Sequence, residues 1–143
     1  MLITRKMDYG LRIMMSLGLR AGDRVSGADL ADAAEVSRGF ALKIVRQLAQ
    51  AGLVLARRGV GGGVDLARDP AQITLYEILD ASGSVRPINQ CIAEPRLCDR
   101  SNACAAHRLL RPIQEKIDHE LKSITLADLV AKQRTLNATS QKA

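Results

Sequence analysis

Three consecutive glycines, Gly61, Gly62 and Gly63, constrain the fold of this chain more than any other sequence feature. They lie between two short runs that have strand character, LVLARR at 53–58 and VDLAR at 64–68. Because glycine adopts left-handed dihedrals without steric cost, this arrangement favours a hairpin of two strands with a glycine tip. We therefore predict a small β wing in this region.

The segment before the glycines predicts two short helices joined by a tight turn. Ser26 is a good N-cap, and Asp29 follows three residues later in the first turn of the expected helix. Ser37 caps the next helix, which carries apolar residues at helical spacing and stops near Gly52. Two helices joined by so short a turn form a helix-turn-helix. With the hairpin, they predict a winged helix-turn-helix domain over residues 1–83.

Basic residues gather in the same part of the chain. Residues 36–64 contain no acidic side chain but five basic ones: Arg38, Lys43, Arg46, Arg57 and Arg58. A surface that faces the phosphates of DNA needs such charge, and the formal net charge of +6 suits an anionic partner. A merely solvated basic face is the alternative. A nucleotide-binding loop is disfavoured, because no Lys-Ser or Lys-Thr pair follows the glycines.

The bulk composition favours a small helical protein. A chain of 143 residues is long enough for one domain with a real core, or for a small domain with an appended helix. Two tyrosines, one phenylalanine and no tryptophan leave aliphatic side chains to build the core, which favours packed helices. Neither a bilayer-spanning apolar run nor an apolar signal region is evident, so we expect a soluble, cytoplasmic protein without a membrane partner.

Further helices are expected on both sides of the winged region. Apolar residues at helical spacing predict a first helix over about residues 3–22. Thr74 and Glu77 form a capping box, which predicts a fourth helix that ends near Gly83. These helices complete the expected DNA-binding domain.

The C-terminal part, residues 108–136, predicts a long helix and a short one. A narrow apolar seam steps along it by three and four residues: Leu110, Ile113, Ile117, Leu121 and Ile124. Such a seam favours a homodimer, with an intrachain core contact as the alternative, and Pro112 fits the first turn or marks a kink. Thr125 and Asp128 then cap a last short helix, and the polar tail 137–143 is expected to be disordered.

All the cysteines of the chain lie in the polar stretch 84–107: Cys91, Cys98 and Cys104. Thiolates are strong soft ligands and a loop can wrap around a metal, so this stretch predicts a metal site. An odd number of thiols without a signal region disfavours a disulfide framework. The gaps of six and five residues lack the C-x2-C pairs usual for zinc, and they fit a three-thiolate iron-sulfur site with another fourth ligand at least as well. Three incidental cysteines are the structural alternative.

Over nearly its whole length the sequence resembles the IscR/NsrR family of bacterial winged-helix regulators, which are dimers that bind DNA and carry an iron-sulfur cluster. The resemblance rests on the three cysteines and on five segments: LITRKMDYGLRIM, LKIVRQLAQAGLV, RRGVGGGVDLARD, ITLYEILDA and ITLADLV. The glycine tip with downstream cysteines is quite specific to that family. The individual helices are not.

The resemblance implies that the three cysteines bind the cluster, that the third helix enters the major groove and that Arg58 reaches the minor groove. The residues expected to contact DNA are Arg38, Gly39, Lys43, Arg46, Arg57, Arg58 and Gly61. Positions that are polar base readers in IscR-like members fall here on Gly39, Leu42 and Lys43, so the operator sequence does not carry over. The first two cysteines are also separated by one residue more than in the family, which leaves the cluster type open.

Two residues compete for the fourth ligand position. His107 lies three residues after Cys104, as in the C-x2-H ending of IscR-like members with a 2Fe-2S cluster. Asp8 matches the aspartate that NsrR-like members supply from the partner subunit to a 4Fe-4S cluster. We favour His107 and a 2Fe-2S cluster, because spacing to a nearby cysteine constrains geometry more than a distant aspartate does. The structural alternatives are a polar helix-start residue for His107 and, for Asp8, a solvated charge or an ion pair with Arg12.

The sequence thus predicts a mainly α protein with a small β wing, in which a winged helix-turn-helix is followed by a long C-terminal dimerisation helix. Its expected function is that of a transcriptional regulator, a repressor, whose binding to double-stranded DNA is controlled by an iron-sulfur cluster that senses iron-sulfur status, nitric oxide or redox state. The alternative is a winged-helix regulator that uses its cysteines as a thiol switch or zinc site. An enzyme is disfavoured, because neither His107 nor His119 has an evident catalytic partner.

Overall fold

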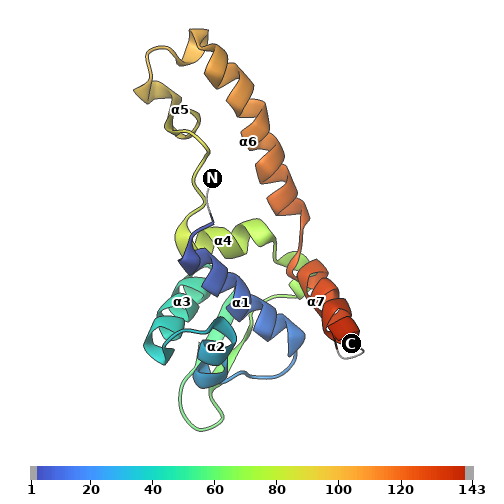
Figure 1. The fold of residues 1–143 in the computed structure, drawn as a ribbon. Coiled ribbons are helices and arrows are strands. Elements are labelled where there is room, and N and C mark those ends of the chain that lie inside the picture. Colours follow the sequence, from blue (N-terminus) through green and yellow to red (C-terminus); the bar gives the residue numbers. More distant parts are fainter. Residues whose placement is uncertain (1–2, 141–143) are drawn as a thin grey trace.

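A computed structural model of the chain describes residues 3–140. Its N-terminal part forms a body of four helices and a hairpin, shown in blue to green in Figure 1. The elements of this body are α1 (Arg5–Leu19), α2 (Gly27–Ala34), α3 (Arg38–Gln50), β1 (Val54–Arg57), β2 (Gly63–Leu66), the 3-10 turn η1 (Pro70–Gln72) and α4 (Leu75–Gly83). Helices with a small antiparallel hairpin confirm the winged-helix fold class that the sequence predicted.

The C-terminal part leaves this body and returns to it. The cysteine segment rises away from α4, the long helix α6 runs back, and the last helix α7 packs against α1 (Figure 1). The elements are α5 (Gln90–Ala93), the 3-10 turns η2 (Pro95–Leu97) and η3 (Ser101–Ala103), α6 (Ala105–Ser123) and α7 (Leu126–Ser140). Within residues 3–140, none of the helices is long and apolar enough to cross a membrane.

Local capping chemistry sets the helix-turn-helix. The amide of Asp29 donates to Ser26 Oγ at 3.1 Å, and the amide of Phe40 donates to Ser37 Oγ at 3.4 Å, as the sequence predicted. Between the two helices, Glu35 adopts a left-handed conformation with φ 57° and ends α2. This short turn fixes the angle at which α3 leaves α2.

The hairpin is joined to the body at its base. β1 and β2 pair antiparallel, with Val54 opposite Leu66 and Arg57 opposite Gly63. Val25 adds an isolated bridge to Val64, through reciprocal backbone hydrogen bonds of 2.9 Å. The hairpin is therefore the expected wing, and its second strand is held on both sides.

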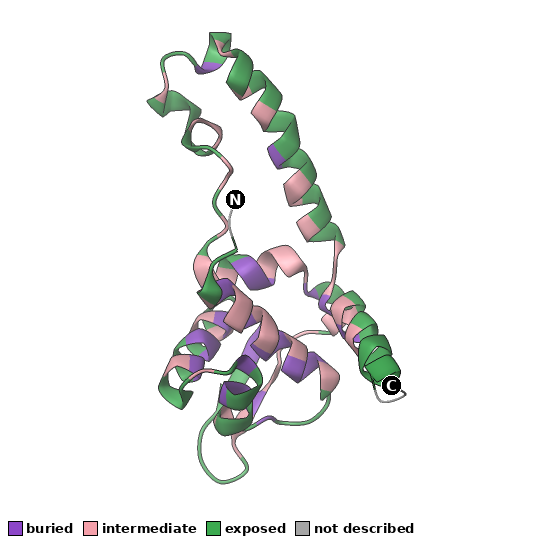
Figure 2. Ribbon diagram, viewed as in Figure 1, coloured by how far each residue is buried: buried purple, intermediate pink, exposed green. Residues whose placement is uncertain are grey.

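The core fills the body and the start of α7, where the buried residues gather in Figure 2. Its largest fully buried side chains are aliphatic or methionine: Val25, Ile13, Met14, Leu17, Leu30, Ile44, Leu48, Leu53, Ile73, Ile78, Leu79 and Leu126. Gly18 admits α7 to this core, because a Cβ at that position would lie 2.6 Å from Val130 Cγ2. The packing of α7 on α1 closes the chain into one body below the projecting α6.

The boundary of the long helix differs from the prediction. α6 begins at Ala105, directly after Cys104, so Pro112 lies inside the helix and not in its first turn. The residues between them, AAHRLLR, are good helix formers, which start the helix early. Pro112 lacks the amide that would otherwise donate to a carbonyl one turn earlier. The helix tolerates it on a side that is exposed.

The last helix is also longer than predicted. A disordered tail was expected from residue 137, but α7 continues to Ser140, while residues 141–143 and 1–2 lie outside the described part. Side-chain hydrogen bonds one turn apart support the extension: Gln133 Nε2 donates to Asn137 Oδ1 at 2.8 Å, and Thr139 Oγ1 donates to the carbonyl of Thr135 at 3.0 Å. Composition alone did not reveal these contacts.

Candidate nucleic-acid interface and cysteine segment

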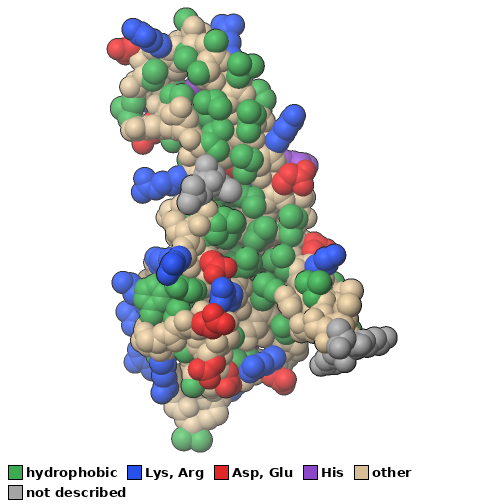
Figure 3. Space-filling view, viewed as in Figure 1, with side chains coloured by type: hydrophobic (Ala, Val, Ile, Leu, Met, Phe, Trp, Pro, Cys, Tyr) green, Lys and Arg blue, Asp and Glu red, His purple; other side chains and the backbone are tan. Residues whose placement is uncertain are grey.

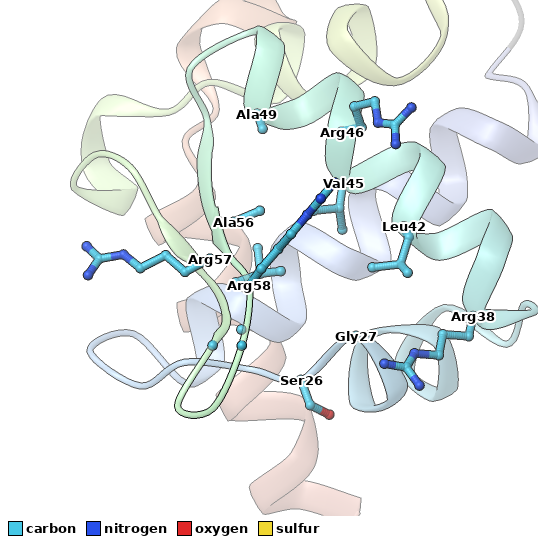
Figure 4. A pocket seen from close by; sticks show the side chains of 14 residues that line it. Ser26, Gly27, Arg38, Leu42, Val45, Arg46, Ala49, Ala56, Arg57 and Arg58 are labelled. Carbon is cyan, nitrogen blue, oxygen red and sulfur yellow. The ribbon is translucent and has the colours of Figure 1, made fainter.

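A groove of about 620 Å³ lies between α3 and the wing. Figure 4 shows the side chains that line it, with Arg38, Leu42 and Arg46 from α3 on one side and Arg57 and Arg58 from the wing on the other. The N-terminus of α2 closes one end of the groove. The structure thus brings together four of the basic residues that the sequence singled out.

The helix α3 presents one face to the core and the opposite face to solvent. Its buried side chains are Ala41, Ile44, Val45 and Leu48, at helical spacing. The exposed residues are Arg38, Gly39, Leu42, Lys43, Arg46 and Gln50. Because the apolar stripe is anchored in the core, the basic face is held outward in a fixed orientation. Lys43 and Gly39 are exposed on this face but lie outside the groove.

Glycines shape the tip of the wing. Gly59 and Gly61 have φ angles of 91° and 73°, in the left-handed region that favours glycine. A Cβ on Gly62 would lie 2.5 Å from the carbonyl oxygen of Arg57, so the turn also needs a bare backbone there. As neighbours in an extended strand end, Arg57 and Arg58 point to opposite sides, and Arg58 is the one directed toward α3 (Figure 4).

The groove and its surroundings form an unneutralised basic surface. Within residues 3–140, none of Arg38, Lys43, Arg46, Arg57 and Arg58 makes a salt bridge. Figure 3 shows blue side chains gathered along the edge formed by α3, whereas the acidic side chains lie mainly over the neighbouring helices. Unpaired cations on a rigid face attract a polyanion such as the DNA backbone, and they release its counterions on binding.

The structure adds residues that the sequence analysis missed. Arg24 Nη1 donates to the carbonyl oxygen of Gly61 at 2.7 Å and so holds the tip of the wing against the body. Ser26 and Gly27, at the N-terminus of α2, line the groove. Ser26 was interpreted only as a cap, and no local pattern marks Arg24, because its partner is 37 residues away.

The cysteine segment is built from single turns. Its backbone hydrogen bonds are local, such as Glu94 to Gln90 at 2.9 Å and Ser101 to Cys98 at 3.0 Å. Between residues 3 and 140, two hydrogen bonds that involve side chains join it to α6: Arg108 Nη2 donates to the carbonyl of Asn102 at 3.2 Å, and the amide of Ile88 donates to a side chain in the middle of α6. Locally bonded turns with few long-range contacts open at low free-energy cost.

The three thiols are free and half-buried in this segment. In the described part of the chain, no three His, Cys, Asp or Glu side chains come together as a metal-holding group, so the structure does not bring Cys91, Cys98 and Cys104 into one ligand set. Cys104 is the N-cap of α6, and His107 lies in the first turn of that helix. Within the described residues, the buried Nδ1 of His107 has no hydrogen-bond partner, and burying an unpaired polar atom costs free energy.

The three thiols and the imidazole are chemically suited to hold an iron-sulfur cluster. Three thiolates and an imidazole are ligands that such clusters accept. A site that is completed by its ligand needs a donor atom that is not already bonded and a backbone that can move. Within residues 3–140, His107 Nδ1 is such an atom, and Cys91 and Cys98 lie on turns held by local hydrogen bonds.

The rival fourth ligand lies elsewhere. Asp8 is on α1, where its carboxylate pairs with Arg12 Nε at 3.1 Å, the ion pair that the sequence offered as its structural alternative. Arg12 also pairs with Glu35 at 3.0 Å and so links α1 to the left-handed turn after α2. These contacts raise the pKa of the Arg12 guanidinium, first through its hydrogen bond to Glu35 and then through the charge of Asp8.

The apolar seam of α6 is largely uncovered. Ile113 is 48% exposed, and Leu110, Ile117, Leu121 and Ile124 are only half-buried. Beside the seam, Leu109 is exposed, and the one buried residue of α6 within the described chain is Gln114, which is 4% exposed. An amphipathic helix whose apolar side is this open leaves a face available for another helix.

Comparison with known proteins places this architecture. The model of the Rrf2 family, described as an iron-dependent transcriptional regulator, matches residues 3–132. A candidate HTH-type transcriptional regulator of Azotobacter vinelandii is 32% identical over 133 residues, which cover 92% of this chain and 80% of the relative. A candidate HTH-type transcriptional regulator of Aquifex aeolicus is 26% identical over 132 residues, which cover 91% and 92%.

Solved structures agree with this assignment. CymR, the global cysteine regulator of B. subtilis, superposes with a TM-score of 0.74 at 27% identity, covering 92% of this chain and 98% of that one. T. potens IscR gives a TM-score of 0.72 at 26% identity, with coverage of 93% and 88%. The oxidised form of Staphylococcus aureus CymR gives 0.71 at 25% identity, with coverage of 91% and 96%. The fold, the basic groove and the family match over 130 residues together show that this chain belongs to the Rrf2 family of winged-helix transcriptional regulators.

Proposed function

We propose that this protein is a transcriptional repressor that binds double-stranded DNA as a homodimer, and whose affinity depends on the state of its cysteine segment. The observation that carries the proposal is the groove between α3 and the wing, where the lining residues in the described part of the chain include four arginines and no acidic residue. On this proposal α3 enters the major groove and Arg58 reaches toward the minor groove beside it. Gly39 and Lys43 on α3 and Gly61 at the tip of the wing are exposed and are proposed to contact the DNA as well.

The dimer is proposed to form along α6. The open apolar seam is long enough to pair with its copy, and association would remove side chains such as Ile113 from water. Two copies present two α3 helices, which suits an operator with two half-sites. Any change that moves α6 relative to the body then changes the spacing of these two helices.

The regulatory group is proposed to be an iron-sulfur cluster held by Cys91, Cys98, Cys104 and His107, with a 2Fe-2S cluster favoured. When bound, such a cluster supplies a centre sensitive to iron-sulfur status, nitric oxide and redox state. The chain's own residues transmit the change: Cys104 and His107 sit at the start of α6, so drawing them toward Cys91 and Cys98 moves the end of that helix. Asp8 with a 4Fe-4S cluster remains the alternative ligand arrangement.

A second candidate is a thiol switch without iron. It is favoured by the free, half-buried thiols on easily opened turns. It is also supported by two of the similar CymR structures, one of a global cysteine regulator and one of an oxidised form. Zinc bound by the same thiols belongs to this class of explanation.

One experiment tests the DNA-binding part of the proposal. Duplexes selected by the full-length protein from a random pool are measured by fluorescence anisotropy at several salt concentrations, for the wild type and for Arg58→Ala. We expect nanomolar to micromolar binding that weakens as salt rises. In the variant the slope of log K against log salt should be shallower by about one, because residue 58 no longer neutralises a phosphate. Binding without salt dependence, or an unchanged slope in the variant, rejects the groove as the interface.

A second measurement separates the two sensing candidates. Protein purified without oxygen is assayed for iron, acid-labile sulfide and visible absorption, and each of Cys91→Ser, Cys98→Ser and Cys104→Ser is compared with it. A cluster predicts iron and sulfide in the parent and loss of both in each variant. A colourless parent whose DNA affinity changes on mild thiol oxidation supports the thiol switch, and stoichiometric zinc supports a structural metal site.

A further inference from the structure

We propose that Leu42 is a base-reading side chain that recognises the 5-methyl group of thymine in the major groove. The inference deepens the proposed function and rests on it, because it requires α3 to enter DNA. Part of the sequence specificity then comes from an apolar contact to a base. The arginines of the groove contribute mainly attraction to phosphates.

Leu42 occupies the middle of the face that α3 turns outward. It is 44% exposed, and among the exposed residues of α3 it is the one large apolar side chain. Arg38 and Arg46 lie one turn before and after it along the same side of the helix. In the free protein the exposed part of this side chain lies in water between two cations. It gains by burial once the groove is filled.

The surroundings hold Leu42 in place. Gly27, at the start of α2, lies directly behind it: a Cβ at Gly27 would come within 3.1 Å of Leu42 Cδ2. The missing side chain lets the N-terminus of α2 pack against the isobutyl group. Figure 4 shows Leu42 directed into the groove between Gly27 and the wing. A side chain that is supported on one side loses less rotamer freedom on binding than a free one.

The chemistry of the major groove selects the ligand. Guanine, cytosine and adenine present hydrogen-bonding atoms there, and thymine alone adds a methyl group. Leu42 has no donor or acceptor, so opposite a polar base edge it would strip water without replacing the hydrogen bond. Opposite thymine it buries a methyl group against its own carbons. The same contact therefore rewards thymine and disfavours the other bases.

The test removes only the methyl group. In the best selected duplex, each thymine is replaced in turn by deoxyuridine, and affinity is measured for the wild type, for Leu42→Ala and for Gln50→Ala. Gln50 is the matched control, because it is a neutral residue exposed on the same face of α3. We expect one thymine in each half-site whose replacement weakens wild-type binding about three- to fivefold, as burial of one methyl group predicts. The ratio of the two dissociation constants, deoxyuridine duplex over thymine duplex, should fall to one in Leu42→Ala and stay at the wild-type value in Gln50→Ala.

Two results overturn the inference. Either no thymine-to-deoxyuridine replacement changes wild-type binding, or the weakening persists undiminished in Leu42→Ala. The salt slope should be the same for Leu42→Ala and the wild type, because the contact releases no counterion. Failure of the proposed function looks different, since the wild type would then bind no duplex in a salt-dependent manner.

Discussion

The backbone amide of Ile88 donates a hydrogen bond of 2.8 Å to Oε1 of Gln114, across 26 residues of sequence. The other end of the same side chain, Gln114 Nε2, donates to Asp118 Oδ1 at 2.7 Å. Gln114 thereby joins the start of the cysteine segment to the middle of α6. It is polar and 4% exposed on a helix whose apolar side chains are mostly open, so its burial serves this junction.

Replacing Gln114 by Ala should loosen the cysteine segment. The partly buried amide of Ile88 loses its partner, which costs about 1 kcal/mol of folding free energy by the usual worth of such a bond. Hydrogen exchange over residues 88–98 should speed up by about fivefold, while that of α1 stays unchanged. Arg111→Ala, which removes an exposed ion pair with Glu115 on the same helix, is the control. Equal exchange in the two variants would deny Gln114 this role.

Loss of the Arg24 side-chain donor should free the tip of the wing. Arg24→Met keeps the aliphatic stem but removes the bond to the carbonyl of Gly61, so the glycine turn should sample more conformations. DNA affinity is expected to fall several-fold, and backbone NMR order parameters of residues 59–63 should drop. Arg20→Met removes a neighbouring arginine that pairs with Asp29, and it should leave the tip rigid. If the order parameters of the tip stay unchanged in Arg24→Met, the hydrogen bond from Arg24 to Gly61 does not hold the wing in place.

Two helical glycines should respond oppositely to alanine. A Cβ on Gly10 would collide with the fully buried Ser82, whose hydroxyl donates to the carbonyl of Ile78 at 2.7 Å. Gly10→Ala should therefore lower the free energy of unfolding by about 1–3 kcal/mol. Gly39 has open space around it, and alanine there should raise that free energy by about 0.5–1 kcal/mol. Urea denaturation checks both, and a neutral Gly10→Ala would mean that α1 and α4 separate easily.

The capping box of α4 should make stability depend on pH. Burial raises the pKa of Glu77, but hydrogen bonds from Thr74 and Arg68 outweigh it and hold this pKa below the ordinary 4.5. A depressed folded-state pKa means that the stabilisation is present above pH 4.5 and is lost as pH falls through the lower, folded value. The melting temperature should therefore fall more steeply between pH 6 and 3 in the parent than in Glu77→Gln. Glu115→Gln, which changes an exposed carboxylate on α6, is the control, and its melting temperature should show the same dependence on pH as that of the parent.

The fourth ligand should be identified by spectroscopy of the loaded protein. We expect His107→Ala to shift the visible spectrum or shorten the lifetime of the cluster, because within residues 3–140 the Nδ1 of this imidazole has no hydrogen-bond partner and lies only three residues after Cys104 in the sequence. Asp8→Ala should leave both nearly unchanged. Its control is Glu35→Ala, which removes the other carboxylate partner of Arg12. The reverse pattern, with a 4Fe-4S spectrum in the parent, assigns the ligand to Asp8.

Local chemistry made much of the fold predictable. The hydroxyls of Ser26, Ser37 and Thr74 accept the expected amide hydrogen bonds within three residues, and each sets a helix start that the sequence alone indicated. The glycine hairpin follows the same logic, because a left-handed conformation at Gly61 depends on the residue itself. Such features need no knowledge of the distant chain.

Features that depend on distant partners were not predictable. No local pattern near Arg24 predicts its contact with Gly61. The sequence shows that Gln114 is a polar residue beside an apolar seam, but not that it bonds to Ile88. The long helix was expected from residue 108, with Pro112 in its first turn or at a kink, but the strong helix formers before Pro112 extend the helix back to Ala105. The spacing of the cysteines likewise predicts ligands but not their positions in space.

The uncovered seam of α6 and the groove beside α3 share no residue, and they lie in different parts of the chain (Figure 1). A chain with a disabled groove, such as Arg58→Ala, keeps its seam and on the proposed dimer would still capture an intact partner. The mixed pair would hold one working α3 helix where an operator with two half-sites needs both. In a cell that makes both chains, alleles that damage the groove should therefore be dominant, whereas alleles that unfold the body, such as changes at Leu48, should be recessive.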